Sequence, residues 1–156
     1  MVASRRRGNP RPSSDGASGL ARVARRVLAW EGADAARLEL TLLDPRAMRR
    51  LNRRAFGRRA LTDVIAFALP QPDGTLVGDV YICPAVAERW VRAEPGTPGH
   101  RRRVAEELVR LAVHGALHVL GYEHPEGAGR VRSAMWRRQE RYVRRLGGGR
   151  AGRRGR

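Results

Sequence analysis

Apolar residues recur at helical spacing in some stretches of the chain and alternate with polar residues in others. Within residues 18–30, Leu20, Val23 and Val27 fall on one face of a helix, whereas residues 37–43 alternate as a half-buried strand does. Along the whole chain, the two periodicities predict helices over residues 18–30, 45–52, 84–90, 101–120 and 131–146, and strands over residues 37–43, 62–67 and 75–83.

The predicted elements run in the order helix, strand, helix, two strands and then helices. This order favours an α+β fold, in which a small mixed β-sheet is packed with helices. Residues 18–146 contain every predicted element and have the length of a single domain. Residues 1–17 and 147–156 are rich in Arg, Gly, Pro and Ser, and are predicted to be a disordered basic arm and a disordered basic tail.

The charge of the chain is strongly unbalanced. All 32 basic residues are arginine, against 15 acidic residues, which gives a net charge of +17. A GC-rich coding sequence explains the choice of arginine over lysine, but Asp and Glu codons are GC-rich too, so it does not explain the excess. An excess of this size predicts attraction to nucleic acid, whose phosphates arginine binds in a bidentate fork.

Two further features narrow the class of protein. No run of about 18 apolar residues occurs, so no membrane-spanning segment is expected. The single cysteine, Cys83, excludes an intrachain disulfide, and its place at the end of an apolar run predicts a buried thiol.

Three of the four histidines fall within eleven residues, at the end of the longest predicted helix. His114 and His118 are four apart, so their imidazoles lie on one helical face, one turn apart. Gly121 can end the helix with a positive φ and let the chain turn back, which brings His124 to the same ion. The pattern predicts one divalent ion, zinc first, on the long helix and the turn after it.

Three protein ligands leave one coordination position open, as in catalytic zinc sites. A closed structural site would need Cys83 or His100, and His100 is expected at the surface of a Pro-, Gly- and Arg-rich loop. The spacing matches the long metalloprotease pattern H-E-x-x-H-x-x-G-x-x-H, except that Gly115 stands where the protease has its general base. The metal ligands are therefore present and the protease base is missing.

Four blocks in the same order carry a resemblance to a known family. Residues 114–124 resemble H-G-x-L-H-L-x-G-Y-D-H, the hallmark of the YbeY family of bacterial endoribonucleases. Residues 51–67 are similar to the family's L-N-x-x-Y-R…P-T-D-V-L-S-F, residues 77–82 to its L-G-D-I-x-I strand, and residues 135–140 to the opening of its last helix.

The resemblance implies a zinc-dependent, single-strand-specific endoribonuclease with an α+β fold, acting in 16S rRNA 3′-end maturation and ribosome quality control. It implies one Zn²⁺ per chain, single-stranded RNA and the ribosomal subunit as partners, and a cytoplasmic location. The family's Y-R pair aligns with Ala55-Phe56 here, so its arginine is absent at that position.

Other residues are candidates for supporting roles. Glu123 could orient a metal ligand or act as a weak base, or it could be a surface residue of the turn. Trp30, Trp90 and Trp136 are expected to pack in the core rather than stack on bases. The arginines nearest the missing one, which could bind phosphate or simply be solvated, are Arg53, Arg54, Arg58 and Arg59.

Two other functions compete with the nuclease. The first is a ribosome-assembly factor that binds RNA through arginines and uses its metal for stability, without turnover. The second is a metallopeptidase, which Gly115 disfavours.

Overall fold

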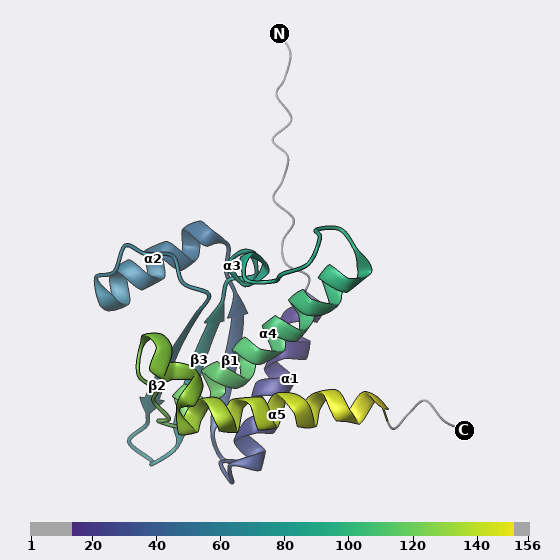
Figure 1. Ribbon diagram of the computed structural model, residues 1–156. Coiled ribbons are helices and arrows are strands. Elements are labelled where there is room, and N and C mark those ends of the chain that lie inside the picture. Colours follow the sequence, from purple (N-terminus) through teal and green to yellow (C-terminus); the bar gives the residue numbers. More distant parts are fainter. Residues whose placement is uncertain (1–13, 152–156) are drawn as a thin grey trace.

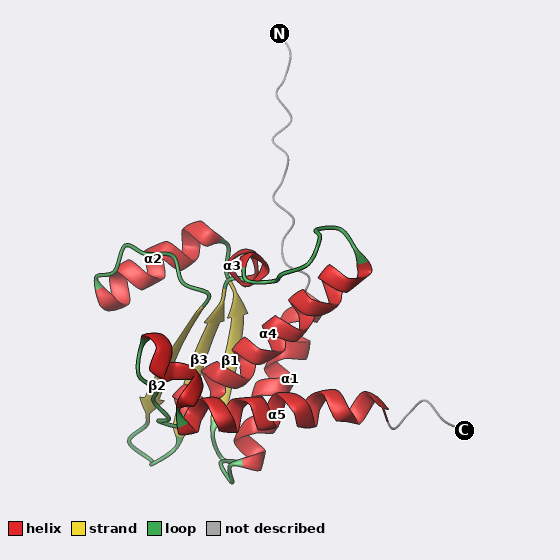
Figure 2. Ribbon diagram, in the orientation of Figure 1, coloured by secondary structure: helices red, strands yellow, loops and turns green. Residues whose placement is uncertain are grey.

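A small mixed sheet packed with helices forms the framework of the molecule (Figures 1 and 2). The computed structural model describes residues 14–151. The elements are α1 (Ser14–Trp30), β1 (Arg37–Leu42), α2 (Pro45–Phe56), β2 (Val64–Pro70), β3 (Leu76–Ile82), α3 (Pro84–Arg89), α4 (Pro98–Val119), the 3-10 helix η1 (Gly127–Arg132) and α5 (Ala134–Ala151). The predicted α+β class is confirmed.

The sheet has the strand order β1-β3-β2, with β3 in the centre. β2 and β3 pair antiparallel as a hairpin, whereas β1 pairs parallel to β3. Val80, on the central strand, lies opposite Leu40 on one side and Ala66 on the other. The chain therefore passes through α2 and β2 before it returns beside β1.

The helices α1 and α4 lie side by side and cover one face of the sheet (Figure 1). On β3, the alternating residues Gly78, Val80 and Ile82 are buried, as expected for a strand with one face against helices. The main core lies between these layers. A smaller cluster contains Met48 of α2, Ile65 of β2 and the fully buried thiol Cys83, as predicted for the cysteine.

Two glycines let α4 approach β3 closely. A Cβ atom on Gly115 would lie 2.5 Å from a methyl carbon of Val80, and one on Gly78 would lie 2.5 Å from a methyl carbon of Val119. Val80 of β3 thus packs against Gly115 of α4, and Val119 of α4 packs against Gly78 of β3. These contacts fix the C-terminal half of α4, which carries two of the three clustered histidines, against the central strand.

The helix boundaries correct part of the predicted arm and tail. α1 begins at Ser14, inside the range 1–17, and α5 continues to Ala151, inside the range 147–156. A helix can extend past its apolar face because each added residue also adds a backbone hydrogen bond. Residues 1–13 and 152–156 lie outside the described residues. Among the helices that are described, none combines the length and apolar character needed to cross a bilayer.

Candidate metal centre

The three clustered histidines meet through one nitrogen of each ring. His114 and His118 lie in the last turns of α4, and His124 follows the turn after it. The Nε2 atom of His114 is 3.0 Å from Nε2 of His118 and 3.3 Å from Nε2 of His124. Each histidine offers a ligand atom within 4.8 Å of the others, and within residues 14–151 they form the one group able to hold a metal ion in this way.

Gly121 brings the third histidine back, as predicted. Its φ is +90°, in the region that glycine adopts without strain. Its amide donates to the His118 carbonyl at 2.9 Å, and the amide of Tyr122 donates to the Leu117 carbonyl at 3.1 Å. The backbone is thereby turned sharply after α4, and His124 faces the helix.

A largely buried carboxylate, that of Glu31, anchors this turn. The hydroxyl of Tyr122 donates to Glu31 at 2.7 Å, in the turn that follows α1. Two groups of α5 donate to the same carboxylate, the guanidinium of Arg138 at 2.8 Å and the hydroxyl of Tyr142. Glu31 therefore ties α1, α5 and the turn between two of the histidines together.

Gln139 determines which nitrogen of His114 faces the cluster. The side chain of Gln139 is 1% exposed, and its Nε2 donates to Glu140 at 3.2 Å. Its Oε1 is therefore the acceptor for the Nδ1–H of His114, at 2.7 Å. His114 Nε2 then carries no proton and presents a lone pair. The Nδ1–H of His124 donates in the same way to the Pro125 carbonyl at 3.0 Å, which leaves its Nε2 free.

Burial favours the neutral form of the two helical histidines. The pKa of His114 is lowered to about 3, chiefly by burial; positive charges on neighbouring groups, including Arg130, add to this shift, and the hydrogen bond with Gln139 opposes it. Burial also lowers the pKa of His118. Neutral imidazole is the form that binds a metal ion.

The donor set fits a zinc ion. Zinc–nitrogen bonds of about 2.0–2.1 Å in a tetrahedron put the nitrogens about 3.3 Å apart. The observed separations of 3.0 and 3.3 Å agree with this value. Three imidazoles that converge through their Nε2 atoms are also the ligand set of open catalytic sites.

Neither candidate for a fourth ligand lies in the group. Cys83 is buried in the smaller cluster with Met48 and Ile65. His100 lies on the first turn of α4, at the end opposite His114, and its Nε2 is 2.9 Å from Glu88 of α3. The prediction that His100 is a surface residue is wrong, because α4 begins at Pro98 and this turn packs on α3.

The other sequence candidates lie further out. Glu123 is exposed, with its carboxylate 3.8 Å from Nδ1 of His118. Arg58 reaches the loop after His124, where it is 3.8 Å from Glu126. No hydrogen bond or ion pair among the described residues joins the remaining predicted arginines to the histidines; these are Arg53, Arg54 and Arg59.

A cavity of about 410 Å³ opens beside His114, and its lining includes residues that the sequence analysis missed. Arg130 and Gln139 both contribute to it. Gln139 follows Met135 at helical spacing on the buried face of α5. A polar residue at such a position is unusual, and this could have identified Gln139 as a functional residue from the sequence. Trp90 also lines the cavity and is 68% exposed, so the prediction that it packs in the core is wrong.

Comparison with known proteins identifies a family. The family model described as Endoribonuclease YbeY matches residues 14–147. Relatives from several bacteria bear the name Endoribonuclease YbeY. The relative from Moorella thermoacetica is 42% identical over 124 residues, 72% of this chain and 76% of the relative. The one from Chlorobium phaeovibrioides is 34% identical over 134 residues, 83% of this chain and 82% of the relative.

A third relative is longer than this chain. The protein from Anaeromyxobacter sp. is 41% identical over 109 residues, which cover 69% of this chain and 54% of the relative. The chain thus spans about half the length of this relative. A solution structure of a protein from Thermotoga maritima shares the fold, with a TM-score of 0.59 at 23% identity, over 93% of this chain and 91% of that one.

Proposed function

The chain belongs to the Endoribonuclease YbeY family, and from this premise we propose that it is a zinc-dependent endoribonuclease that cleaves single-stranded RNA. The proposal includes a role in 16S rRNA 3′-end maturation and ribosome quality control, on the ribosomal subunit in the cytoplasm. It also makes residues 18–146 the catalytic domain.

One observation carries the proposal. Three Nε2 atoms converge at separations that suit one zinc ion, beside an open cavity, in a chain of an endoribonuclease family. His114, His118 and His124 would hold the ion, and Gln139 would keep His114 in the tautomer that binds it. When bound, the ion supplies Lewis-acid stabilisation of the negative charge that develops on a phosphoryl oxygen.

The remaining residues position the RNA and handle protons. Arg58, which lies 3.8 Å from Glu126 in the loop after His124, would bind a phosphate of the RNA, and the exposed Arg53, Arg54 and Arg59 would add positive charge. Glu123, whose carboxylate lies 3.8 Å from Nδ1 of His118, would move closer to orient that ring or would accept a proton as a weak base.

The test is cleavage of a labelled single-stranded RNA by the full chain. We expect cleavage that stops on chelation, returns with zinc and is much slower on the duplex of the same sequence. His118→Ala, purified in parallel, should lose both bound zinc, measured by elemental analysis, and cleavage, which also controls for contaminating nucleases. Cleavage that persists in His118→Ala would contradict the proposal.

A metal-stabilised RNA-binding protein without turnover is the second candidate. The observation that favours it is Phe56, which stands where the family has an arginine and stacks on Phe67 with ring centroids 5.9 Å apart. His114→Ala separates the two functions. If this variant loses its metal but keeps both RNA affinity and rRNA processing, the nuclease proposal fails.

The peptidase alternative has lost support. The position of the protease base is Gly115, where even a Cβ atom would lie 2.5 Å from Val80. A glutamate side chain therefore has no space there. Robust cleavage of unstructured peptides by the pure protein would be the result that revives a peptidase.

A further inference from the structure

The cavity beside His114 has the size and lining of a ligand site rather than of a packing gap. Its volume of about 410 Å³ falls in the usual range for pockets that bind small molecules, about 300–1,000 Å³. It lies between the loop that precedes β2, helix α4 and the segment formed by η1 and α5. The residues that matter below are Asp63, Trp90, His114, Arg130 and Trp136.

Two charged groups of this lining have no ion-pair partner among the described residues. Glu107 and Glu140 are both paired with Arg110, at 2.8 Å each. Arg130 and Asp63 form no such pair, and the Nε atom of Arg130 is buried without a hydrogen-bond partner. A buried donor without an acceptor costs free energy, which a ligand oxygen would recover. Arginine matches a phosphate particularly well, and Asp63 can accept from a hydroxyl or an amino group.

Two tryptophans complete the lining. The guanidinium carbon of Arg130 lies 5.6 Å from the centroid of the Trp136 ring, so the cation is held over an aromatic face. Trp90 is 68% exposed, a large apolar surface left in water at the edge of the cavity. Aromatic faces beside a cation are the usual means of binding single-stranded nucleic acid without regard to sequence.

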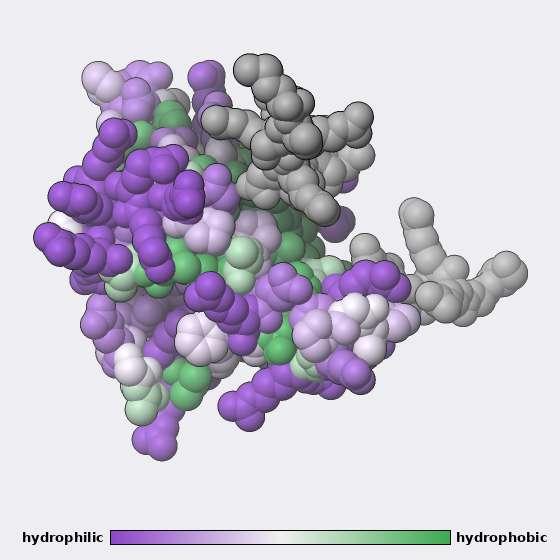
Figure 3. Space-filling view, turned by 90° about the horizontal axis from the view of Figure 1, so that it is seen from above, coloured by the Kyte–Doolittle hydropathy of each residue, from purple (hydrophilic) through white to green (hydrophobic). Residues whose placement is uncertain are grey.

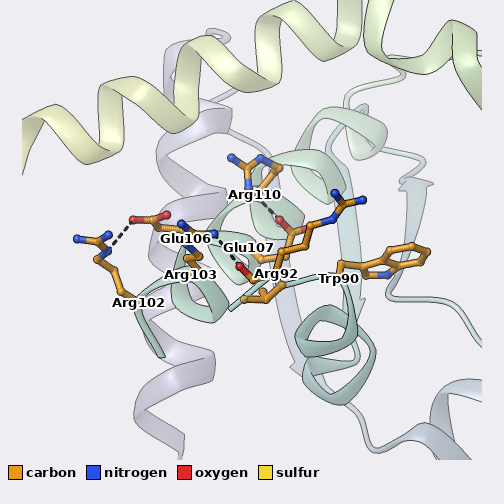
Figure 4. Close-up of a pocket in the computed structure, with 8 residues that line it drawn as sticks. Trp90, Arg92, Arg102, Arg103, Glu106, Glu107 and Arg110 are labelled. Carbon is orange, nitrogen blue, oxygen red and sulfur yellow. Dashed lines mark hydrogen bonds and ion pairs between the residues drawn. The ribbon is translucent and has the colours of Figure 1, made fainter. Parts of the chain in front are cut away.

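The same tryptophan links this cavity to a second one. Figure 4 shows Trp90 at one end of a neighbouring pocket, with four arginines and two glutamates along the rest of it; the pocket has a volume of about 480 Å³. Arg92, Arg102 and Arg103 line that pocket, and Glu107 and Arg110 belong to both. Arg102 and Arg110 are paired there with Glu106 and Glu107. An RNA strand that stacks on Trp90 would therefore meet Arg92 and Arg103, which form no ion pair among the described residues, on the side away from the histidines.

We propose that the cavity beside His114 is a nucleotide subsite for single-stranded RNA, in which Arg130 binds a phosphate and Trp90 and Trp136 contact a base. Asp63 accepts from an amino group of the base. The subsite rests on the proposed function, since it names how that function would hold its substrate. It extends that function to residues outside the histidine cluster and the predicted arginines.

The test is binding of a short, fluorescein-labelled, 2′-O-methyl single-stranded RNA to the full chain, measured by anisotropy. Arg130→Ala should raise Kd by at least about fivefold and lower the salt dependence by about one counterion. Trp90→Ala, at an exposed position, should raise Kd by about fivefold or more. Arg132→Ala is the matched control, because it removes the same charge from an exposed position of η1 and should leave Kd within about twofold.

The outcomes separate the subsite from the nuclease. If Arg130→Ala and Trp90→Ala, folded by circular dichroism, bind as tightly as Arg132→Ala, the subsite is overturned, whether or not the wild type cleaves RNA. If the two variants lose affinity while the wild type fails to cleave any RNA, the subsite stands and the proposed nuclease activity fails.

Discussion

Gly115 lies where α4 crosses the central strand, and its lack of a side chain has a structural cause. The methyl carbons of Val80 occupy the space that a Cβ atom would need, at 2.5 and 3.1 Å. Gly115 therefore matters in two ways. It stands where the protease pattern has its glutamate base, and it allows α4 to approach the sheet closely.

Gly115→Ala should therefore destabilise the protein although alanine favours helices. We expect the free energy of unfolding to fall by about 1–3 kcal/mol, the usual cost of an overpacked core. Urea unfolding measures it. The loss should shrink when Val80→Ala is also present, because that substitution removes the methyls in conflict. Gly147→Ala is the control: that helical position has open space, so alanine should stabilise by about 0.5–1 kcal/mol.

Gln139 offers a second prediction at the residue scale. Gln139→Met keeps the size of the side chain but removes the acceptor for His114 Nδ1–H. Loss of a partner that orients a metal ligand typically weakens metal binding about 10- to 100-fold, so the zinc Kd should rise by that factor. Competition with a chromophoric chelator measures it. Gln71→Met, at an exposed turn residue bonded to Leu69, should leave the zinc Kd unchanged, and an equal Kd in both variants would show that Gln139 has no such role.

At the scale of elements, Glu31 joins helices that are far apart in the chain. Burial, the largest single influence, raises the pKa of its carboxyl, but hydrogen bonds from Tyr142, Tyr122 and Arg138 together lower that pKa below the ordinary value of 4.5. A group whose pKa is lower in the folded state stabilises that state above the unfolded pKa. The contribution is lost as the pH falls through the folded pKa.

Glu31→Gln should reveal this contribution. Near neutral pH the variant should be less stable than the wild type by about 1.5–3 kcal/mol, the range for hydrogen bonds to a charged group. The difference should diminish in acid, once the wild-type carboxyl is protonated. Urea unfolding at several pH values measures it, with Asp34→Asn, an exposed carboxylate nearby, as the control for charge. A difference that stays constant from neutral pH into acid would contradict the assignment.

The type and order of the elements could be predicted from the sequence, whereas their pairing could not. The strand periods and the Asp44-Pro45 start of α2 are local signals, and Asp44 accepts from the Ala47 amide at 2.8 Å as its cap. The parallel pairing of β1 with β3 joins segments separated by α2 and β2, so it depends on how α1 and α4 cover the sheet. No local pattern contains that information.

The residues of the site also fall into a group that the sequence predicts and a group that it does not. His114, His118 and His124 could be predicted to meet because one helix turn and one glycine bring them together. Gln139 and Arg130 approach from α5 and η1, and their positions depend on packing between helices. Their distance from the histidines along the chain therefore follows no pattern that would predict the contact.

At the scale of the whole molecule, the positive charge is spread over a largely polar surface. Hydrophilic side chains cover most of the described part of the face seen in Figure 3, which lies at the end of the molecule where α2 and α3 are found in Figure 1. With a net charge of +17, the potential around the protein attracts polyanions from a distance. Such attraction promotes encounter with RNA, while the cavity beside His114 would distinguish a strand that can enter from a duplex that cannot.

The affinity for single-stranded RNA should accordingly fall steeply with salt. Each phosphate that the arginines neutralise releases condensed counterions, so the logarithm of the binding constant should decline with the logarithm of salt concentration by about 0.7 per contacted phosphate. Anisotropy titrations over a series of salt concentrations measure this slope. A methylphosphonate strand of the same sequence has no backbone charge and should bind weakly with almost no salt dependence. If the natural strand also gave a flat response, the arginines would not be contacting phosphates, and their number would reflect only the composition of the gene.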